Sequence, residues 1–128
     1  MKSILQINVQ IDGHHVQMEF DTGAPCSIIN KKRLRVIKPG FILRDTDRRF
    51  VNYTDHYIEC IGSTPVNVSM GTTIRRMNLY TVDCYFDILF GREWITQFAK
   101  EINFVDLFSN EIHALLLHHA YLRITKNK

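Results

Sequence analysis

A strict alternation of apolar and polar residues near the N-terminus is the feature that most constrains the fold. Single polar residues separate the members of one apolar series, Leu5, Ile7, Val9 and Ile11. This period of two predicts a strand with one buried face. Asp12-Gly13 follows, and the pair is typical of a two-residue hairpin turn because both residues accept a positive φ. The alternation resumes over residues 16–20, which predicts an antiparallel hairpin whose second strand runs directly into Asp21.

Further short strands are predicted in the middle of the chain. Residues 49–61 are mostly β-prone, and the polar interruption at residues 52–56 predicts the tip of a second hairpin. Residues 66–70 alternate again before Gly71, and residues 77–82 predict another strand. Residues 31–47 have an irregular pattern broken by Pro39-Gly40, which predicts a loop with a short strand at residues 41–43.

The C-terminal part combines a buried strand with helical spacing. The apolar run Ile88-Leu89-Phe90 is typical of a strand buried on both faces, and Gly91 ends it. The apolar residues of the segment 94–98 then have the spacing of one short helix. Residues 102–104 predict a brief strand, and Ser109 is a candidate cap for a further helix carrying Ile112, Leu115 and Leu116. That last segment is either a partner-contacting helix or the start of a linker.

This succession of strands predicts a mainly β fold. A chain of 128 residues with 45% hydrophobic residues is long enough for one domain with a buried core. We place that domain in residues 1–104 and a C-terminal extension, helical or linker, in residues 105–128. Hairpin, loop and apolar strand occur in the same order in both parts of the domain, so we expect two structural halves.

Composition argues against several classes of protein. No apolar run is long enough to span a bilayer, and polar residues interrupt the N-terminus too early for a secretory signal. Three cysteines without close spacing argue against a disulfide framework and a zinc site, and they suit a reducing, intracellular and therefore cytoplasmic location. The net charge of +3 comes from short basic runs typical of a solvated surface. We therefore expect no membrane partner, no metal and no nucleic acid. The weakest alternative is a β-domain that binds single-stranded nucleic acid through the arginines of residues 44–49.

Asp21-Thr22-Gly23 has two interpretations. Asp and Gly favour turns, so the tripeptide alone is typical of an exposed turn. However, the following residues are small or apolar, with Ala24 next and an Ile-Ile pair at residues 28–29, whereas an exposed turn would continue with polar residues. The context favours a carboxylate held in a loop that is tucked into the molecule.

At this point the sequence resembles a known family. Asp21-Thr22-Gly23-Ala24, followed by Ser27-Ile28-Ile29, resembles the active-site loop of retroviral-type (retropepsin-like) aspartic proteases. The run from Ile88 to Arg92 resembles the family's second signature, and Glu93-Trp94-Ile95 is similar to the version in gypsy-class long-terminal-repeat retrotransposons. Residues 53–62 resemble the flap hairpin, and residues 102–104 resemble the final strand that joins two subunits. The resemblance covers about residues 4–104, and the order and spacing of these motifs are more specific than any one of them.

The resemblance implies a closed acid-protease barrel that works as a symmetric homodimer. Each chain has a single Asp-Thr-Gly, so two copies of Asp21 would face each other across a two-fold axis. Two carboxylates a few ångström apart share a proton, because both cannot ionise cheaply. The ionised one takes a proton from a water that attacks the peptide carbonyl, and the protonated one donates to the developing oxyanion. This chemistry requires no cofactor, no metal and no covalent intermediate.

The resemblance also implies roles for the neighbours of Asp21. Thr22 would hydrogen-bond across the dimer axis, Gly23 would give backbone access to the substrate, and Ala24 would line the substrate groove. The flap tip would close over an extended peptide, and it consists of Asn52, Tyr53, Thr54 and Asp55. Gly91 would let the second loop pack closely behind the first, and Arg92 would anchor the following helix by a charged hydrogen bond.

Three positions depart from the family pattern. The flap tip has Thr54-Asp55-His56 where the family commonly has a glycine. Pro25 stands where some members have an acidic residue that pairs with the arginine, and Phe90 is bulkier than the usual aliphatic residue. We expect an aspartic endopeptidase that cuts an extended polyprotein segment, as in Gag-Pol processing of a retrotransposon or a host-domesticated derivative. The alternative is a dimerising peptide-binding module that keeps the protease fold without turnover.

Overall fold

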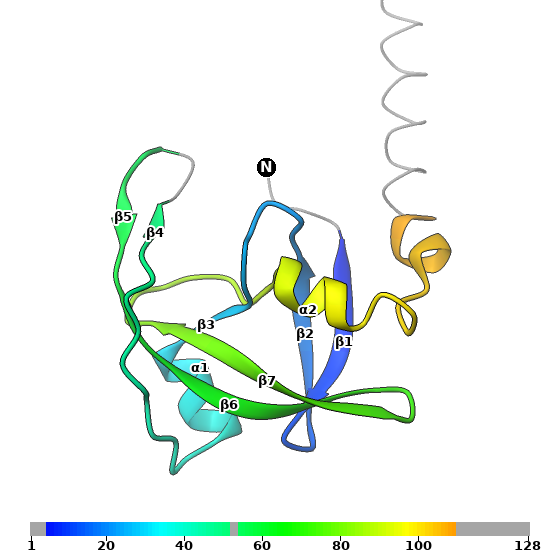
Figure 1. Ribbon diagram of the computed structural model, residues 1–128, viewed down its shortest axis with the longest axis horizontal. Helices are drawn as coiled ribbons and strands as arrows, with labels where there is room; N and C mark the ends of the chain where they lie inside the picture. Colours follow the sequence, from blue (N-terminus) through cyan, green and yellow to red (C-terminus); the bar gives the residue numbers. More distant parts are fainter. Residues whose placement is uncertain (1–4, 52–53, 110–128) are drawn as a thin grey trace, which may run out of the picture.

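Six strands form a closed barrel in the computed structural model, which describes residues 5–51 and 54–109 (Figure 1). The order of strands around the barrel is β1-β2-β8-β3-β7-β6. Their bounds are β1 Gln6–Ile11, β2 His14–Phe20, β3 Ile28–Asn30, β6 Cys60–Met70, β7 Thr73–Val82 and β8 Leu89–Phe90. A separate two-stranded sheet consists of β4 (Phe50–Val51) and β5 (Tyr57–Ile58). The helices α1 (Lys31–Ile37) and α2 (Arg92–Gln97) are short, and residues 104–109 are also helical.

The N-terminal hairpin forms as predicted. β1 and β2 pair antiparallel with Ile11 opposite His14, so Asp12 and Gly13 are the loop. Their φ values of 48° and 83° are the left-handed angles that a tight hairpin turn requires. The apolar residues of both strands are buried and the intervening residues are exposed or half-buried, so the period of two decides which face enters the core.

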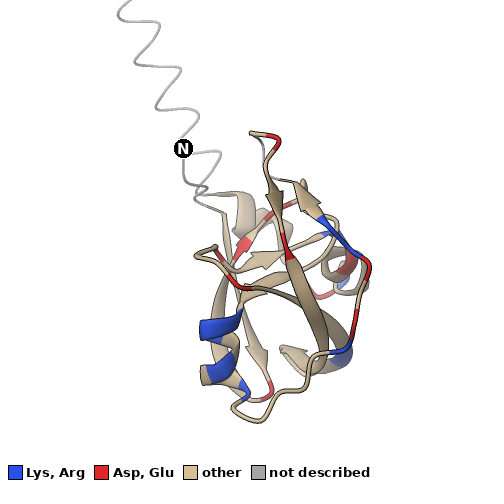
Figure 2. Cartoon of the chain, turned by 90° about the vertical axis from the view of Figure 1, so that its left-hand side faces the viewer, with Lys and Arg blue, Asp and Glu red and all other residues tan. Residues whose placement is uncertain are grey.

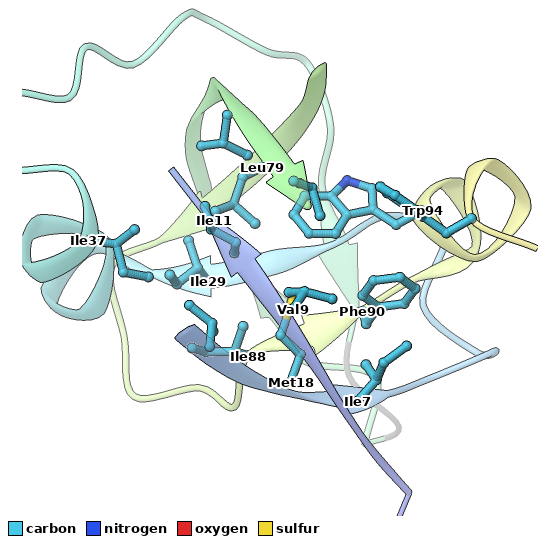
Figure 3. Close-up of a cluster of buried hydrophobic side chains, with 14 of the residues drawn as sticks. Ile7, Val9, Ile11, Met18, Ile29, Ile37, Leu79, Ile88, Phe90 and Trp94 are labelled. Carbon is cyan, nitrogen blue, oxygen red and sulfur yellow. The ribbon is translucent and has the colours of Figure 1, made fainter. Parts of the chain in front are cut away.

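The barrel interior is filled by apolar side chains from strands and helices together. Figure 3 shows ten labelled residues pointing toward one another: Ile7, Val9, Ile11, Met18, Ile29, Ile37, Leu79, Ile88, Phe90 and Trp94. Phe90 and Trp94 pack edge to face with ring centroids 5.6 Å apart, and the Trp94 Nε1 donates to the carbonyl of Asn78 at 3.0 Å. β8 pairs with β2 along one edge and with β3 along the other. Its apolar run is buried on both faces, because Ile88 and Phe90 enter this core while Leu89 enters a second apolar cluster.

A second, smaller cluster lies between the loop after β2 and the hairpin β4–β5. We call it the groove cluster, and its buried members are Ala24, Cys26, Ile28, Phe50, Tyr80, Val82 and Leu89. Ile58 and Cys60 pack against it. Residues that are far apart in the sequence therefore meet beside the Asp21 loop.

The predicted loop at residues 31–47 is partly wrong, because it contains α1. The side chain of Asn30 caps this helix by accepting a hydrogen bond from the Arg33 amide at 2.8 Å, and only Leu34 and Ile37 are buried. A helix this short, with so few apolar positions, shows no hydrophobic periodicity in the sequence. Lys32, Arg33 and Arg35 of this helix are exposed, and the Lys and Arg residues of the chain are blue in Figure 2. The strand predicted at residues 41–43 is also wrong, since one isolated bridge, Arg44 to Ser63, occurs there instead.

The strand predicted at residues 102–104 is wrong as well. Residues 104–109 are helical, and the Asn103 side chain caps the turn by accepting from the Asp106 amide at 3.1 Å. Phe104 and Phe108 pack on Phe20 with ring centroids 6.3 and 5.9 Å away, so tertiary packing overrides the local β preference. Ser109 lies within this helix and does not begin it. The expected helical residues Ile112, Leu115 and Leu116 lie outside the described residues.

Candidate active site

Asp21 stands where β2 leaves the barrel. β2 and β8 run parallel, and the Asp21 amide extends their pairing by donating to the Phe90 carbonyl at 3.1 Å. The Asp21 Oδ1 accepts a hydrogen bond from the Gly23 amide at 2.8 Å, which holds the carboxylate in the loop. Asp21 is half-buried while Thr22 and Gly23 are exposed. The carboxylate therefore sits at a surface, on a loop fixed by a buried strand.

Backbone hydrogen bonds join this loop to the start of α2. The amides of Arg92 and Glu93 donate to the carbonyls of Ala24 and Pro25, at 2.8 and 3.2 Å. The first amides of a helix have no partners within the helix, so the loop satisfies groups that would otherwise need a cap or water. The Arg92 Nη1 also donates to the carbonyl of Thr22 at 2.9 Å. Arg92 thus has a backbone partner, although Pro25 offers no acidic side chain.

Gly91 lies so close to the loop that no side chain fits. A Cβ at this position would come within 2.2 Å of the Cys26 carbonyl oxygen and 2.9 Å of that of Ala24. Atoms at such separations overlap severely, and backbone cannot easily move away. The requirement for glycine comes from this close approach, because the φ of Gly91 is an ordinary −95°.

Ser27 is a structural member of the site that the sequence did not single out. Its side chain is fully buried, and its Oγ accepts a hydrogen bond from the Gly91 amide at 3.0 Å. Its carbonyl accepts from the Tyr80 amide at 3.0 Å. A serine directly before Ile28-Ile29 was the available signal, since a polar residue inside a buried apolar run needs a partner.

The hairpin β4–β5 carries the predicted flap residues. Thr54 and Asp55 are exposed at its tip, and the Thr54 Oγ1 and His56 Nδ1 form a 2.7 Å hydrogen-bonded pair. Asp55 has a φ of 63°, so it adopts the left-handed conformation for which a glycine is usual. Asn52 and Tyr53 lie outside the described residues. Phe50, at the base of the hairpin, belongs to the groove cluster together with Ala24 of the Asp21 loop, so the hairpin and the loop are in contact there.

Cys26 does not have the properties of a nucleophile. Its side chain is completely buried, and burial raises the pKa of the thiol to about 11 although the nearby Arg48 lowers it. Such a thiol is almost entirely protonated near neutral pH, and the thiolate is the reactive form. Among the described residues, no group of three or more His, Cys, Asp or Glu side chains is arranged to hold a metal ion. No helix in residues 5–51 and 54–109 is long and apolar enough to cross a bilayer.

Known structures match this arrangement, although no protein-family model and no curated protein sequence matches the chain. The EIAV protease complexed with the inhibitor HBY-793 superposes with a TM-score of 0.64 over 73% of this chain and 86% of its own. The chain has a retropepsin-like fold. The retroviral protease-like domain of Ddi1 from Leishmania major matches with a TM-score of 0.56 over 76% and 78% of the two chains. Identities of 17% and 19% mean that these matches establish the retropepsin-like fold alone.

Proposed function

We propose that this protein is an aspartic endopeptidase that works as a symmetric homodimer. The observation that carries the proposal is the Asp21 carboxylate, held by the Gly23 amide on a surface loop of a retropepsin-like barrel. One chain offers one such carboxylate, and the exposed Thr22 and Gly23 beside it leave a face for a second copy. The site is complete only when two Asp21 loops meet.

In that dimer the pair of carboxylates would share one proton, because both cannot ionise cheaply at short range. The ionised carboxylate takes a proton from water, and the resulting nucleophile attacks the peptide carbonyl. The protonated carboxylate donates its proton to the developing oxyanion. When the tetrahedral intermediate collapses, the first carboxylate passes the proton taken from water to the leaving amine, and a hydroxyl of the intermediate returns a proton to the second carboxylate. The bonds from the Gly23 amide to Asp21 and from Arg92 to Thr22 support this chemistry by fixing the loop before substrate arrives.

The substrate that fits this site is an extended peptide with apolar side chains near the cut. Ala24 on the loop and Phe50 and Ile58 on the hairpin belong to one apolar cluster, so the walls of the groove favour apolar groups. A polyprotein segment from a retrotransposon, or from a host gene derived from one, meets this description. The free thiols of Cys26, Cys60 and Cys84 suit a reducing compartment.

Cleavage of an unstructured, apolar-rich polypeptide between about pH 4 and 7 tests the proposal. We expect Asp21→Asn to reduce kcat by about a thousandfold or more, because the amide cannot accept the proton from water. The exposed Asp83→Asn is the matched control and should keep full activity. A transition-state-mimicking aspartic protease inhibitor should also stop cleavage. Full activity in Asp21→Asn would refute the mechanism.

A peptide-binding module without turnover is the second candidate. It is favoured by the hairpin tip, where Asp55 takes a glycine-like conformation at a cost in strain. A dimer in sedimentation that binds apolar peptides but does not cut them across this pH range would support this candidate and exclude the endopeptidase.

A further inference from the structure

Arg48 joins several parts of the molecule that meet at the groove. It lies two residues before β4, and its Nη2 donates to the Glu93 Oε2 of α2 at 2.7 Å. Its guanidinium also lies over the ring of Tyr80 in β7, with 4.6 Å between Cζ and the ring centroid. A guanidinium both paired and stacked in this way is held more firmly than an ordinary surface cation.

The same guanidinium lies near the thiol of Cys26. Burial raises the pKa of this thiol and the nearby charge of Arg48 lowers it, while the thiol itself has no exposed surface. Arg48 is itself only partly exposed, and its guanidinium packs on Tyr80, which belongs to the groove cluster together with Cys26. Cys26 therefore offers a built-in reporter of whether the Arg48 segment stays in place.

Each partner of Arg48 is fastened to the active-site loop. Cys26 belongs to that loop, the Tyr80 amide donates to the Ser27 carbonyl at 3.0 Å, and the Glu93 amide donates to the Pro25 carbonyl at 3.2 Å. Tyr80 also packs edge to face against Phe50 of β4, with ring centroids 6.3 Å apart. One side chain thus connects the base of the hairpin with several points along the loop.

We propose that Arg48 is a positioning residue that fixes the β4–β5 hairpin against the active-site loop and so sets the width of the peptide groove. The proposal rests on the proposed function, since it assigns Arg48 a role in holding the same substrate. Its physical basis is that the guanidinium is both paired and stacked, because an exposed ion pair alone contributes little to stability. Lysine has the charge but lacks the planar fork, so it should replace Arg48 only in part.

The chain contains a matched control for this arrangement. Arg75 pairs with Glu101 at 2.9 Å, and its guanidinium lies over the ring of Phe98 at 4.9 Å. These residues join β7 to the turn that follows α2, and none of them belongs to the groove cluster. Arg75→Ala removes the same kind of interaction from the body of the barrel.

Thiol labelling measures the contact without requiring activity. Cys60→Ser and Cys84→Ser leave Cys26 as the single thiol, and N-ethylmaleimide then reports its accessibility at about pH 8. We expect Arg48→Ala to accelerate labelling about tenfold or more, because the segment beside the thiol loosens and opens access to it while the barrel stays folded. This gain in access outweighs the loss of the Arg48 charge, which lowers the pKa of the thiol. Arg48→Lys should give an intermediate rate, and Arg75→Ala should match the parent. Equal acceleration in both alanine variants would indicate general destabilisation and overturn the proposal.

Steady-state kinetics on an apolar peptide test the consequence for substrate. With all three cysteines present, Arg48→Ala should raise KM about tenfold and change kcat by less than about threefold, since substrate binding is affected and Asp21 is untouched. Arg48→Lys should recover part of the loss in KM. An unchanged KM in Arg48→Ala, despite faster labelling, would overturn the role in the groove.

The two experiments separate the failure of this proposal from failure of the proposed function. Unchanged labelling in Arg48→Ala, together with cleavage that depends on Asp21, overturns the role of Arg48 and leaves the endopeptidase intact. A wild-type chain that neither cleaves nor binds the peptide overturns both, even where Arg48→Ala releases the thiol of Cys26.

Discussion

The loop that carries Asp21 and the hairpin β4–β5, the two walls of the proposed peptide groove, are attached to the barrel in different ways. The proposed active-site loop, residues 21–27, is joined to β8 and α2 through backbone hydrogen bonds from Asp21, Arg92 and Glu93. The hairpin β4–β5, within the described residues, forms a sheet of its own, and its base meets the loop through side chains such as Phe50 and Arg48. Figure 1 shows this hairpin standing out from the barrel. The loop is therefore the fixed wall and the hairpin the adjustable one.

This difference suits the proposed chemistry. A carboxylate pair works only when its geometry is set before the substrate binds, so the wall that carries Asp21 gains from backbone bonds and close packing. The opposite wall must admit peptides with different side chains, and side-chain contacts can adapt to them. Changes in the fixed wall should therefore affect folding, and changes in the adjustable wall should affect substrate binding.

Gly91→Ala should have the largest effect on stability. The added Cβ would lie 2.2 Å from the Cys26 carbonyl oxygen, so the loop and α2 must separate. We expect a loss of about 3 kcal/mol or more, or failure to fold, measured by urea unfolding. Gly40→Ala is the control, since no atom lies within 4 Å of a Cβ there, and its effect should be within about 0.5 kcal/mol. A stable, active Gly91→Ala protein would mean that the loop is not held rigidly.

Ser27→Ala should have the next largest effect. The substitution leaves the buried Gly91 amide without the hydroxyl that accepts its hydrogen bond at 3.0 Å. An unsatisfied buried donor costs about 1–3 kcal/mol, which urea unfolding resolves. The half-buried Ser69→Ala in β6 is the comparison and should change stability by less than about 0.5 kcal/mol. If both variants unfold at the same urea concentration, the hydroxyl of Ser27 is not important to the fixed wall.

The fixed wall was also the more predictable of the two from sequence. The Asp12-Gly13 turn and the alternation around it act over a few residues, so the hairpin leading to Asp21 follows from local rules. The Asp-Thr-Gly and Phe-Gly-Arg motifs are each only three residues long, so each can be recognised locally. In the structure, the two loops that carry them meet at Gly91. The resemblance to retropepsins therefore predicted the barrel, and the structural matches confirm that fold.

Elements that depend on distant contacts were missed. Arg48 and Glu93 are 45 residues apart, and no periodic pattern links them, so their pairing was invisible before the fold was known. The helix at residues 104–109 replaces a predicted strand because Phe104 and Phe108 find Phe20, a contact made across most of the chain. α1 escaped notice although its cap, Asn30, is a residue type that favours helix starts.

The smallest predicted effect concerns the Arg75–Glu101 pair, which resembles Arg48–Glu93 but belongs to neither wall. Burial alone would raise the pKa of Glu101, but the nearby charge of Arg75 and hydrogen bonding to the carboxylate together outweigh burial, so its pKa lies below the ordinary carboxyl value. A lowered pKa in the folded state stabilises the protein above the ordinary carboxyl pKa, and this contribution disappears as the pH falls through the folded value.

Glu101→Gln should therefore be slightly less stable than wild type at pH 7, and the difference should vanish in acid below the folded pKa of Glu101. Unfolding midpoints of the two proteins across this range measure the difference directly, because the other carboxyl groups titrate equally in both. KM should be the same in both proteins, since no member of this pair touches the groove cluster. A change in KM would show that the barrel body and the adjustable wall are coupled, and the contrast between the two arginine–glutamate pairs would be lost.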